Sequence, residues 1–187
     1  SRWDDMIASR KFNDDLRPFT DRIQNWSKDN KIGSINDFIK ERRWKIKAIG
    51  NTELAKTSVS ITDSSNSFCA IIKNPVKSIF DWLPALAEYT AETLGNSAKG
   101  SIKYQEKVYD YSLEYNESTN TYKFIVDHPS SQLGYLLRRV IYKSAYCINC
   151  EVCEVDCPTG ALSILPDVKI DKSKCIHCHR CLTSHEL

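Results

Sequence analysis

Two stretches in the middle of the chain alternate between apolar and polar residues. The apolar positions are Tyr109, Tyr111, Leu113 and Tyr115 in the first stretch, and Tyr122, Phe124 and Val126 in the second. Side chains of a β-strand point alternately to two faces, and the polar residues 116–120 between the stretches suit a turn. The pattern predicts an antiparallel hairpin with one aromatic face. Such a face is typical of a protein core, and a platform that stacks nucleic-acid bases is the alternative.

Two segments carry the end signals of helices. Residues 34–50 begin at Ser34, a residue type favoured as an N-cap, and end at Gly50, a residue type favoured just past a helix. Residues 84–94 begin with a proline, which is favoured in a first helical turn, and are followed by a glycine. We predict a helix over each segment.

A third helix is predicted by apolar spacing. It begins after Ser130 or Ser131, and its apolar positions recur three and four residues apart at Leu133, Leu136, Leu137, Val140 and Ile141. This helix leads to Cys147 with almost no linker. We therefore expect the cysteine-rich segment to be docked on the domain that precedes it.

Residues 57–67 are dominated by Ser, Thr, Asn and Asp, with Val59 and Ile61 alternating among them. This pattern predicts a short strand that runs into a loop. Cys69 follows in an apolar run, and a lone cysteine in such a run is typical of a small buried side chain. The whole pattern predicts an α+β fold, in which a mixed helical and β-hairpin domain over residues 1–144 precedes a C-terminal module over residues 145–187.

Composition and charge narrow the functional classes. Hydrophobic residues make up 41% of the chain and charged residues 27%, as in soluble globular proteins. No apolar stretch approaches the ~20 residues of a membrane helix, and the charged N-terminus is unlike a signal peptide. We therefore expect a cytoplasmic protein with no membrane partner. The net charge of +2 does not favour nucleic acid, although residues 1–50 carry 12 Lys and Arg against 8 Asp and Glu.

Seven of the eight cysteines lie in two regularly spaced runs. The first run is Cys147, Cys150, Cys153 and Cys157, with gaps of two, two and three residues and a proline after the last. The second is Cys175, Cys178 and Cys181, with His185 where a fourth cysteine is expected. Repeated two-residue gaps are typical of metal ligation and not of the disulfides of small secreted domains. These eight side chains are the candidate metal ligands.

The spacing also indicates which metal group is bound. A cubane cluster presents its irons at separate corners, and a loop with two-residue gaps can wrap three thiolates around three of them. Two such triplets exceed the four ligands of one zinc ion, and a Cys-Pro ending is not a feature of zinc sites. We expect two [4Fe–4S] clusters, with zinc as the alternative metal.

Residues 147–187 resemble the bacterial-type ferredoxins that hold two [4Fe–4S] clusters. The resemblance implies that one cluster is held by Cys157, Cys175, Cys178 and Cys181, because the fourth cysteine of a run serves the other cluster in that family. It assigns the second cluster to Cys147, Cys150 and Cys153. Its fourth ligand remains open between His185, a cysteine beyond Leu187, and no ligand at all in a three-iron cluster. Segments 159–164 and 168–171 resemble the short helix and strand that join the two halves of ferredoxins.

A wider resemblance concerns phosphoadenosine phosphosulfate (PAPS) reductase-like proteins. The cysteine runs, in AYCINCEVCEVDCPTGALSI and KCIHCHRCL, are similar to the C-terminal part of some members, and residues 74–82 (NPVKSIFDW) resemble a segment that follows their catalytic core. The resemblance implies an upstream adenine-nucleotide domain, since no Ser-Gly-Gly-x-Asp-Ser loop is present here. The chain lacks an initiator Met and stops inside a cysteine motif, so we expect a piece of a longer protein with a truncated cluster module.

These observations lead to one main hypothesis and two alternatives. The main one is an iron–sulfur electron-transfer part of a PAPS reductase-like oxidoreductase, with a redox partner or the upstream catalytic domain as its partner. The cysteines would then be ligands and not catalysts. One alternative is a nucleic-acid-associated protein with a structural cluster, using the basic N-terminal helix and the Tyr-rich hairpin. The other is a zinc-stabilised interaction module.

Overall fold

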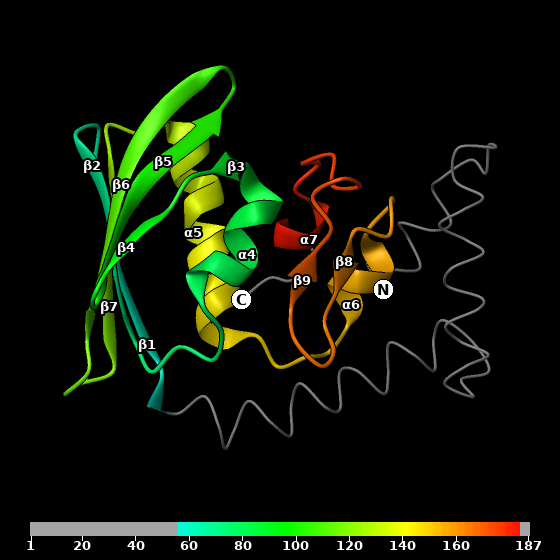
Figure 1. Ribbon diagram of the computed structural model, residues 1–187, viewed down its shortest axis with the longest axis horizontal. Helices are drawn as coiled ribbons and strands as arrows, with labels where there is room; N and C mark the ends of the chain where they lie inside the picture. The colour runs from blue at the N-terminus through cyan, green and yellow to red at the C-terminus, as the bar shows by residue number, and fades with distance from the viewer. Residues whose placement is uncertain (1–55, 184–187) are drawn as a thin grey trace.

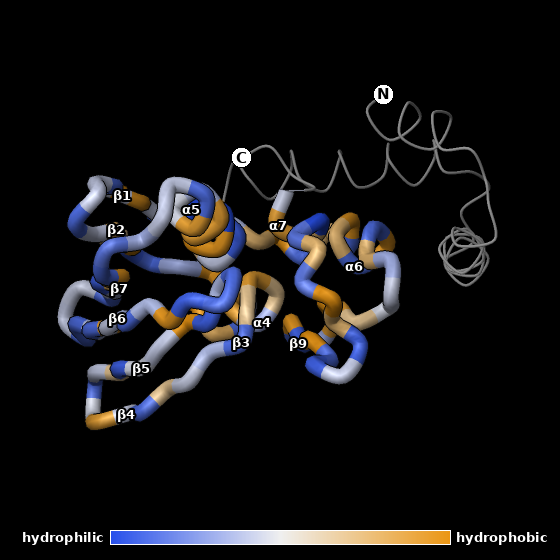
Figure 2. The backbone as a smooth tube through the Cα atoms, turned by 90° about the horizontal axis from the view of Figure 1, so that it is seen from above, coloured by the Kyte–Doolittle hydropathy of each residue, from blue (hydrophilic) through white to orange (hydrophobic). Residues whose placement is uncertain are grey.

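The computed structural model describes residues 56–183, which form three layers (Figure 1). An antiparallel sheet makes the first layer, two helices lie against one of its faces, and the cysteine-bearing segment lies beyond the helices, as Figures 1 and 2 both show. The sheet has seven strands in the order β1-β2-β7-β6-β5-β3, and β4 also pairs with β5. Its strands are β1 (Ser58–Asp63), β2 (Ser67–Lys73), β3 (Glu88–Tyr89), β4 (Glu92–Leu94), β5 (Ser97–Tyr104), β6 (Lys107–Asn116) and β7 (Thr121–Asp127).

The remaining elements belong to the other two layers. Helices α4 (Ile79–Leu86) and α5 (Ser131–Tyr146) form the middle layer. The cysteine-bearing layer contains α6 (Val152–Asp156), β8 (Leu162–Ser163), β9 (Lys169–Ile170) and α7 (Arg180–Thr183). The fold thus mixes helices with an antiparallel sheet, as predicted. No helix within residues 56–183 is long and apolar enough to cross a membrane.

The predicted hairpin is confirmed as β6 and β7. The two strands pair antiparallel, with Leu113 opposite Phe124 and Tyr111 opposite Val126. Phe124 and Val126 are fully buried, and the rings of Tyr111 and Phe124 lie 5.6 Å apart. The aromatic face of this hairpin therefore packs into the core between the sheet and the helices, where Figure 2 places apolar segments of α4 and α5.

The predicted helix before the cysteines is confirmed as α5. Ser130 is its N-cap, and the Ser130 hydroxyl accepts a hydrogen bond from the backbone N–H of Leu133 at 3.2 Å. The five apolar positions of the predicted stripe are all buried. The helix ends at Tyr146, and Cys147 is its C-cap residue. Helix geometry therefore fixes where the first cysteine run leaves the middle layer.

The prediction of a helix over residues 84–94 is wrong. The helix in this region, α4, begins earlier, because Ser78 and Asp81 form a capping box at its N-terminus. Pro84 consequently lies inside the helix and not at its start. The chain after Leu86 leaves the helix and pairs with β5 as β3 and β4, so the backbone N–H and C=O groups that we assigned to a helix are satisfied in the sheet.

The strand predicted within residues 57–67 is confirmed as β1, but the prediction of a buried Cys69 is wrong. Cys69 is half-buried in β2, whereas its neighbours Phe68 and Ala70 are completely buried. Alternation in a strand puts adjacent residues on opposite faces. The Cys69 thiol therefore lies on the face of the sheet that α4 and α5 do not cover.

Tyr111 gives a prediction for alkaline pH. Its hydroxyl donates a hydrogen bond to the backbone oxygen of Thr90 at 2.6 Å, and burial, aided by Tyr89, raises the pKa of Tyr111 from 10.0 to about 12. Ionisation then favours the unfolded chain between pH 10 and 12, so this contribution to stability is present below pH 10 and is lost as pH rises through the folded pKa.

We expect Tyr111→Phe to flatten the loss of stability above pH 10, measured as the free energy of unfolding in urea at a series of pH values. Tyr135→Phe is the matched control, because Tyr135 is 55% exposed on α5. An unchanged alkaline slope in Tyr111→Phe would contradict the prediction.

Candidate metal centre

The two cysteine runs are held by short helices and by the end of α5. Cys147 caps α5, Cys153 lies within α6, and Cys157 caps the end of α6. In the second run, Cys181 lies within α7. All eight cysteines fall within residues 56–183, and the structure of this range pairs none of them in a disulfide bond.

The backbone takes the same unusual conformation at equivalent positions of both runs. Asn149 and His177, each two residues after the first cysteine of its run, have φ of 57° and 49°. Glu151 and His179, each one residue after the second cysteine, have φ of 62° and 61°. A left-handed non-glycine residue costs about 1 kcal/mol or more. The two runs are thus two copies of one strained loop, a kind of strain that proteins retain mainly at functional sites.

A pocket between the runs is lined by four thiols. They are those of Cys157, Cys175, Cys178 and Cys181, which are also the four that the ferredoxin resemblance assigns to one cluster. The space between atoms in this pocket is about 360 Å³, part of it open to solvent, and its wall includes Ala85 of α4 and His179. Folding therefore brings the last cysteine of the first run to the three cysteines of the second.

The thiols do not converge as ligands of one metal ion. Within residues 56–183, no three His, Cys, Asp or Glu side chains are grouped closely enough to hold a single ion. Four thiolates on one zinc ion would each lie about 2.3 Å from it.

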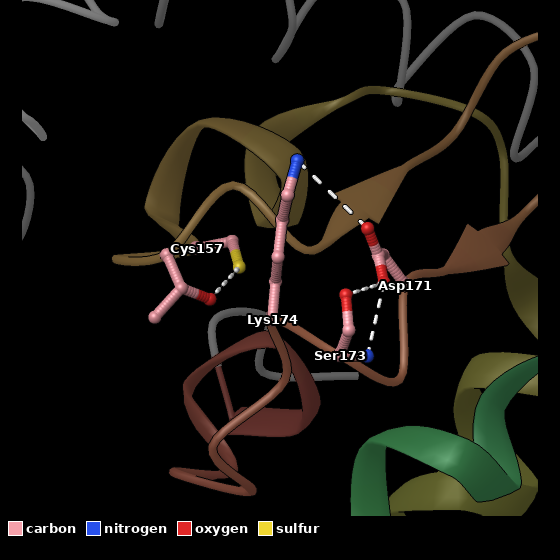
Figure 3. Close-up of polar contacts among 5 residues, drawn as sticks. Cys157, Asp171, Ser173 and Lys174 are labelled. Carbon is pink, nitrogen blue, oxygen red and sulfur yellow. Dashed lines mark hydrogen bonds and ion pairs between the residues drawn. The ribbon is translucent and has the colours of Figure 1, made fainter.

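Cys157 has the environment of a stabilised thiolate. Burial acts to raise its pKa, but hydrogen bonds from the backbone and hydroxyl of Thr159 and from the backbone N–H groups of Leu162 and Ala161 outweigh burial and leave the pKa below its ordinary value. The Cys157 Sγ atom lies 3.8 Å from the Thr159 Oγ1 atom, and Figure 3 marks a contact of the Cys157 sulfur with a dashed line. These donors favour the deprotonated form that metal ligation requires.

Burial strongly desolvates the thiols of Cys153 and Cys181. Burial raises the pKa of Cys153 to about 12; the Lys143 ammonium opposes this, and the thiols of Cys150 and Cys147 add to it. Burial likewise raises the pKa of Cys181 well above its ordinary value, with Cys153 adding to the effect and Lys143 opposing it. Buried, closely spaced thiols resist becoming several separate thiolates. Binding of a metal group would supply the positive charge that lets them deprotonate.

An ion pair ties the two runs together. The Arg180 Nη2 atom lies 2.8 Å from the Asp156 Oδ1 atom, and the Asp156 side chain is only 7% exposed. Asp156 immediately precedes Cys157, and Arg180 immediately precedes Cys181. The ion pair therefore holds near each other two of the cysteines that line the pocket, and neither residue of this pair was predicted.

Contacts with α4 and α5 dock the second run on the middle layer. The His179 Nε2 atom lies 2.8 Å from the Leu86 backbone oxygen at the end of α4. The Arg139 Nε–H of α5 donates to the Leu182 backbone oxygen at 2.9 Å. Leu182 is fully buried and belongs to the same continuous core as α4 and α5. The expected docking of the cysteine-rich segment is confirmed for the described residues.

The turn before Cys175 is shaped by Asp171, another residue that we did not predict. The Asp171 Oδ1 atom accepts hydrogen bonds from the backbone N–H and the hydroxyl of Ser173, and Lys174 pairs with the other carboxylate oxygen at 3.8 Å (Figure 3). The Cys175 N–H donates to the Asp171 backbone oxygen at 2.9 Å. An Asp two residues before a Ser is a recognisable turn signal, so the sequence DKSK could have indicated this role.

The segment joining the runs was only half predicted. The helix expected over residues 159–164 is wrong, because Leu162 and Ser163 form β8. The strand expected over residues 168–171 is confirmed as β9, and the two pair antiparallel with Leu162 opposite Ile170. A two-stranded ladder satisfies backbone groups that a single helical turn would leave unpaired. His185 and the helix predicted over residues 34–50 lie outside the described residues.

Several of residues 74–82, which carry the wider resemblance, have structural roles. Asn74 has a left-handed backbone with φ of 50°, and its N–H donates to the Asn120 oxygen. Asp81 completes the capping box of α4, and Trp82 is completely buried.

No model of a known protein family matches the chain, and no curated protein matches it significantly.

Proposed function

We propose that residues 147–187 form an iron–sulfur electron-transfer module. The observation that carries the proposal is the pocket in which Cys157 of the first run meets the three cysteines of the second. Simple sequence proximity would group Cys157 with the run that contains it. In two-cluster ferredoxins the fourth cysteine of one run instead binds the cluster of the other run, an arrangement that we call crossed.

The donor set fits an iron–sulfur cluster chemically. Thiolates are soft ligands that select iron–sulfur clusters, zinc or Cu(I). The four thiols line one pocket, and four thiolates are the usual ligand set of a [4Fe–4S] cluster. Cys157, Cys175, Cys178 and Cys181 would hold one [4Fe–4S] cluster. Cys147, Cys150 and Cys153 would hold the second, with His185 or a cysteine beyond Leu187 as the fourth ligand, or with three irons and no fourth ligand.

The burial of the ligands gives the two sites different relations to solvent. Such clusters, when bound, supply reversible one-electron oxidation and reduction. Cys150 and Cys153 are buried, whereas Cys178 is exposed. Cys147 is half-buried and Cys157 is buried, so Cys178 is the only exposed thiol of the seven. We infer that a one-electron donor protein approaches the Cys178 side. Electrons would pass from there to the site of Cys147, Cys150 and Cys153.

Our proposal for the electron acceptor rests on the wider resemblance of the sequence alone. We propose that the module serves a PAPS reductase-like oxidoreductase, with its catalytic domain as the acceptor of the electrons. The cysteines are then ligands, and the described residues supply electron transfer and not the site of substrate chemistry.

Anaerobic reconstitution of the full chain with iron and sulfide tests the proposal. We expect a brown protein that bleaches with dithionite. It should hold about seven or eight iron atoms, depending on whether the site of Cys147, Cys150 and Cys153 has a fourth ligand. Cys69→Ser is the matched control, because Cys69 lies on the far face of the sheet and should leave the iron content unchanged. Retention of stoichiometric zinc with no iron, after reconstitution in the presence of both metals, would contradict the proposal.

A further inference from the structure

The two cysteine runs lie in segments of opposite charge. Residues 147–164, which contain the first run, carry three Asp and Glu and no Lys or Arg, a balance of −3. Residues 165–181, which contain the second run, carry four Lys and Arg against two Asp, a balance of +2. A charged molecule that approaches the module would therefore distinguish one run from the other.

The lysines of the second segment are exposed and precede its first cysteine. They are Lys169, Lys172 and Lys174. The Lys172 Nζ atom lies 5.4 Å from the ring centroid of Tyr89 on β3, in a cation–π contact that leaves its charge in place. Lys174 forms the ion pair with Asp171 that Figure 3 shows. In the described part of the chain, neither Lys169 nor Lys172 is paired with a carboxylate.

Backbone hydrogen bonds attach these lysines to the pocket of four thiols. The Asp171 N–H donates to the Ala161 backbone oxygen at 2.8 Å, and the Cys175 N–H donates to the Asp171 backbone oxygen at 2.9 Å. Ala161 and Cys175 both line the pocket. The turn that carries Lys172 and Lys174 is thus bonded to two residues of the pocket wall, and its lysines lie at the margin of the pocket.

The same pocket has an exposed apolar side chain in its wall. Ile176 is 63% exposed, and it lines the pocket together with Cys178, the one exposed thiol of the seven. Interfaces between proteins commonly combine an apolar centre with a polar or charged rim. Ile176 and Cys178 supply such a centre, and the three lysines supply the rim. We call these five residues the lysine-rimmed surface.

We propose that the lysine-rimmed surface is the docking site of an acidic one-electron donor protein. The inference rests on the proposed function: the donor loses one electron, and the cluster of the second run gains it. Both proposed clusters, with their thiolates, would add negative charge to the module, so attraction of an acidic donor depends on the exposed lysines. The acidic segment of the first run would repel the same donor. Charge therefore orients the donor toward the second run.

The test measures how fast a donor of this class reduces the reconstituted full chain. The probe is a chemically reduced plant-type ferredoxin, a small acidic electron carrier, mixed anaerobically with the chain at low and at high salt. The parent is compared with the double variant Lys169→Glu/Lys172→Glu. Lys99→Glu/Lys123→Glu is the matched control, because it changes the net charge equally on the sheet face that α4 and α5 do not cover. Iron content and reduction by dithionite show that each chain holds working clusters.

We expect the donor to reduce Lys169→Glu/Lys172→Glu about tenfold more slowly than the parent at low salt, and the control within about threefold of the parent. Added salt should slow the reduction of the parent, because screening weakens the attraction between exposed charges, and it should not slow the double variant. Lys169→Gln/Lys172→Gln removes the two charges without reversing them. It should be slowed less than the Glu variant, and it decides the result if the Glu variant loses its iron.

Three results would overturn the inference while the proposed function stands, provided that the chains hold iron and are reduced by dithionite. Unchanged rates in both lysine variants would remove the lysines from docking. An equal loss of rate in the variant and its matched control would reduce the effect to net charge, with no docking site. A parent rate that rises with salt would show that this surface repels an acidic donor. A parent chain that takes up no iron would instead overturn the proposed function together with the inference.

Discussion

Replacing Cys157 with serine is expected to remove about half of the iron from the reconstituted chain. The iron lost should be the cluster held by Cys175, Cys178 and Cys181 and not the one held by the run that contains Cys157. The physical reason is the pocket, in which the Cys157 thiol lines the same space as the three thiols of the second run. Serine is a weaker ligand than thiolate, so the cluster that we propose for Cys157 and the second run would lose one of its four ligands.

The cluster that is lost can be identified by comparison with single-run variants. Iron content and spin-resonance spectra of Cys157→Ser are compared with those of Cys178→Ser, which damages the second run, and Cys150→Ser, which damages the first. Cys69→Ser controls for the loss of any one thiol. We expect the Cys157→Ser spectrum to match that of Cys178→Ser. A match with Cys150→Ser would contradict the crossed arrangement.

Phe124→Ala is expected to lower the free energy of unfolding by about 3–5 kcal/mol, the range for removing a buried aromatic side chain from a core. Phe124 is completely buried, its ring contacts that of Tyr111, and it pairs with Ala70 and Leu113 on the neighbouring strands. Truncation leaves a cavity between the sheet and the helices, and α5 cannot collapse into it without moving Cys147.

Urea unfolding of the metal-free chain, followed by circular dichroism, measures this cost without a contribution from metal binding. Val108→Ala is the matched control, because Val108 is 66% exposed on the adjacent strand and should change stability by less than about 0.5 kcal/mol. A cost below about 1 kcal/mol for Phe124→Ala would show that this side chain is not a main element of the core.

The elements that could be predicted are those whose signal lies within a few neighbouring residues. The alternation over β6 and β7 and the apolar stripe of α5 each repeat several times, so the period identifies the element and its buried face. The cysteine spacing is also a local signal, and the cluster that we propose from it stays a prediction. These segments needed no knowledge of what lies beside them.

The elements that could not be predicted depend on a partner distant in sequence. Residues 88–94 carry no strong strand pattern and become β3 and β4 because β5 offers them hydrogen-bonding groups. Residues 162–163 become a strand for the same reason when β9 lies beside them. The half-exposed position of Cys69 follows from which face of the sheet α4 and α5 cover.

The features of the candidate site also fall into those that a local sequence pattern indicates and those that depend on residues distant in sequence. Residue types and gaps alone lead to the hypothesis that seven cysteines are metal ligands, and this assignment stays a prediction. The chain fold brings Cys157 to the second run, pairs Asp156 with Arg180 and buries Lys143 over Trp82. Each of these is a contact between segments that no local pattern relates. Charge and burial at the cysteines therefore come from packing between layers, which sequence spacing does not encode.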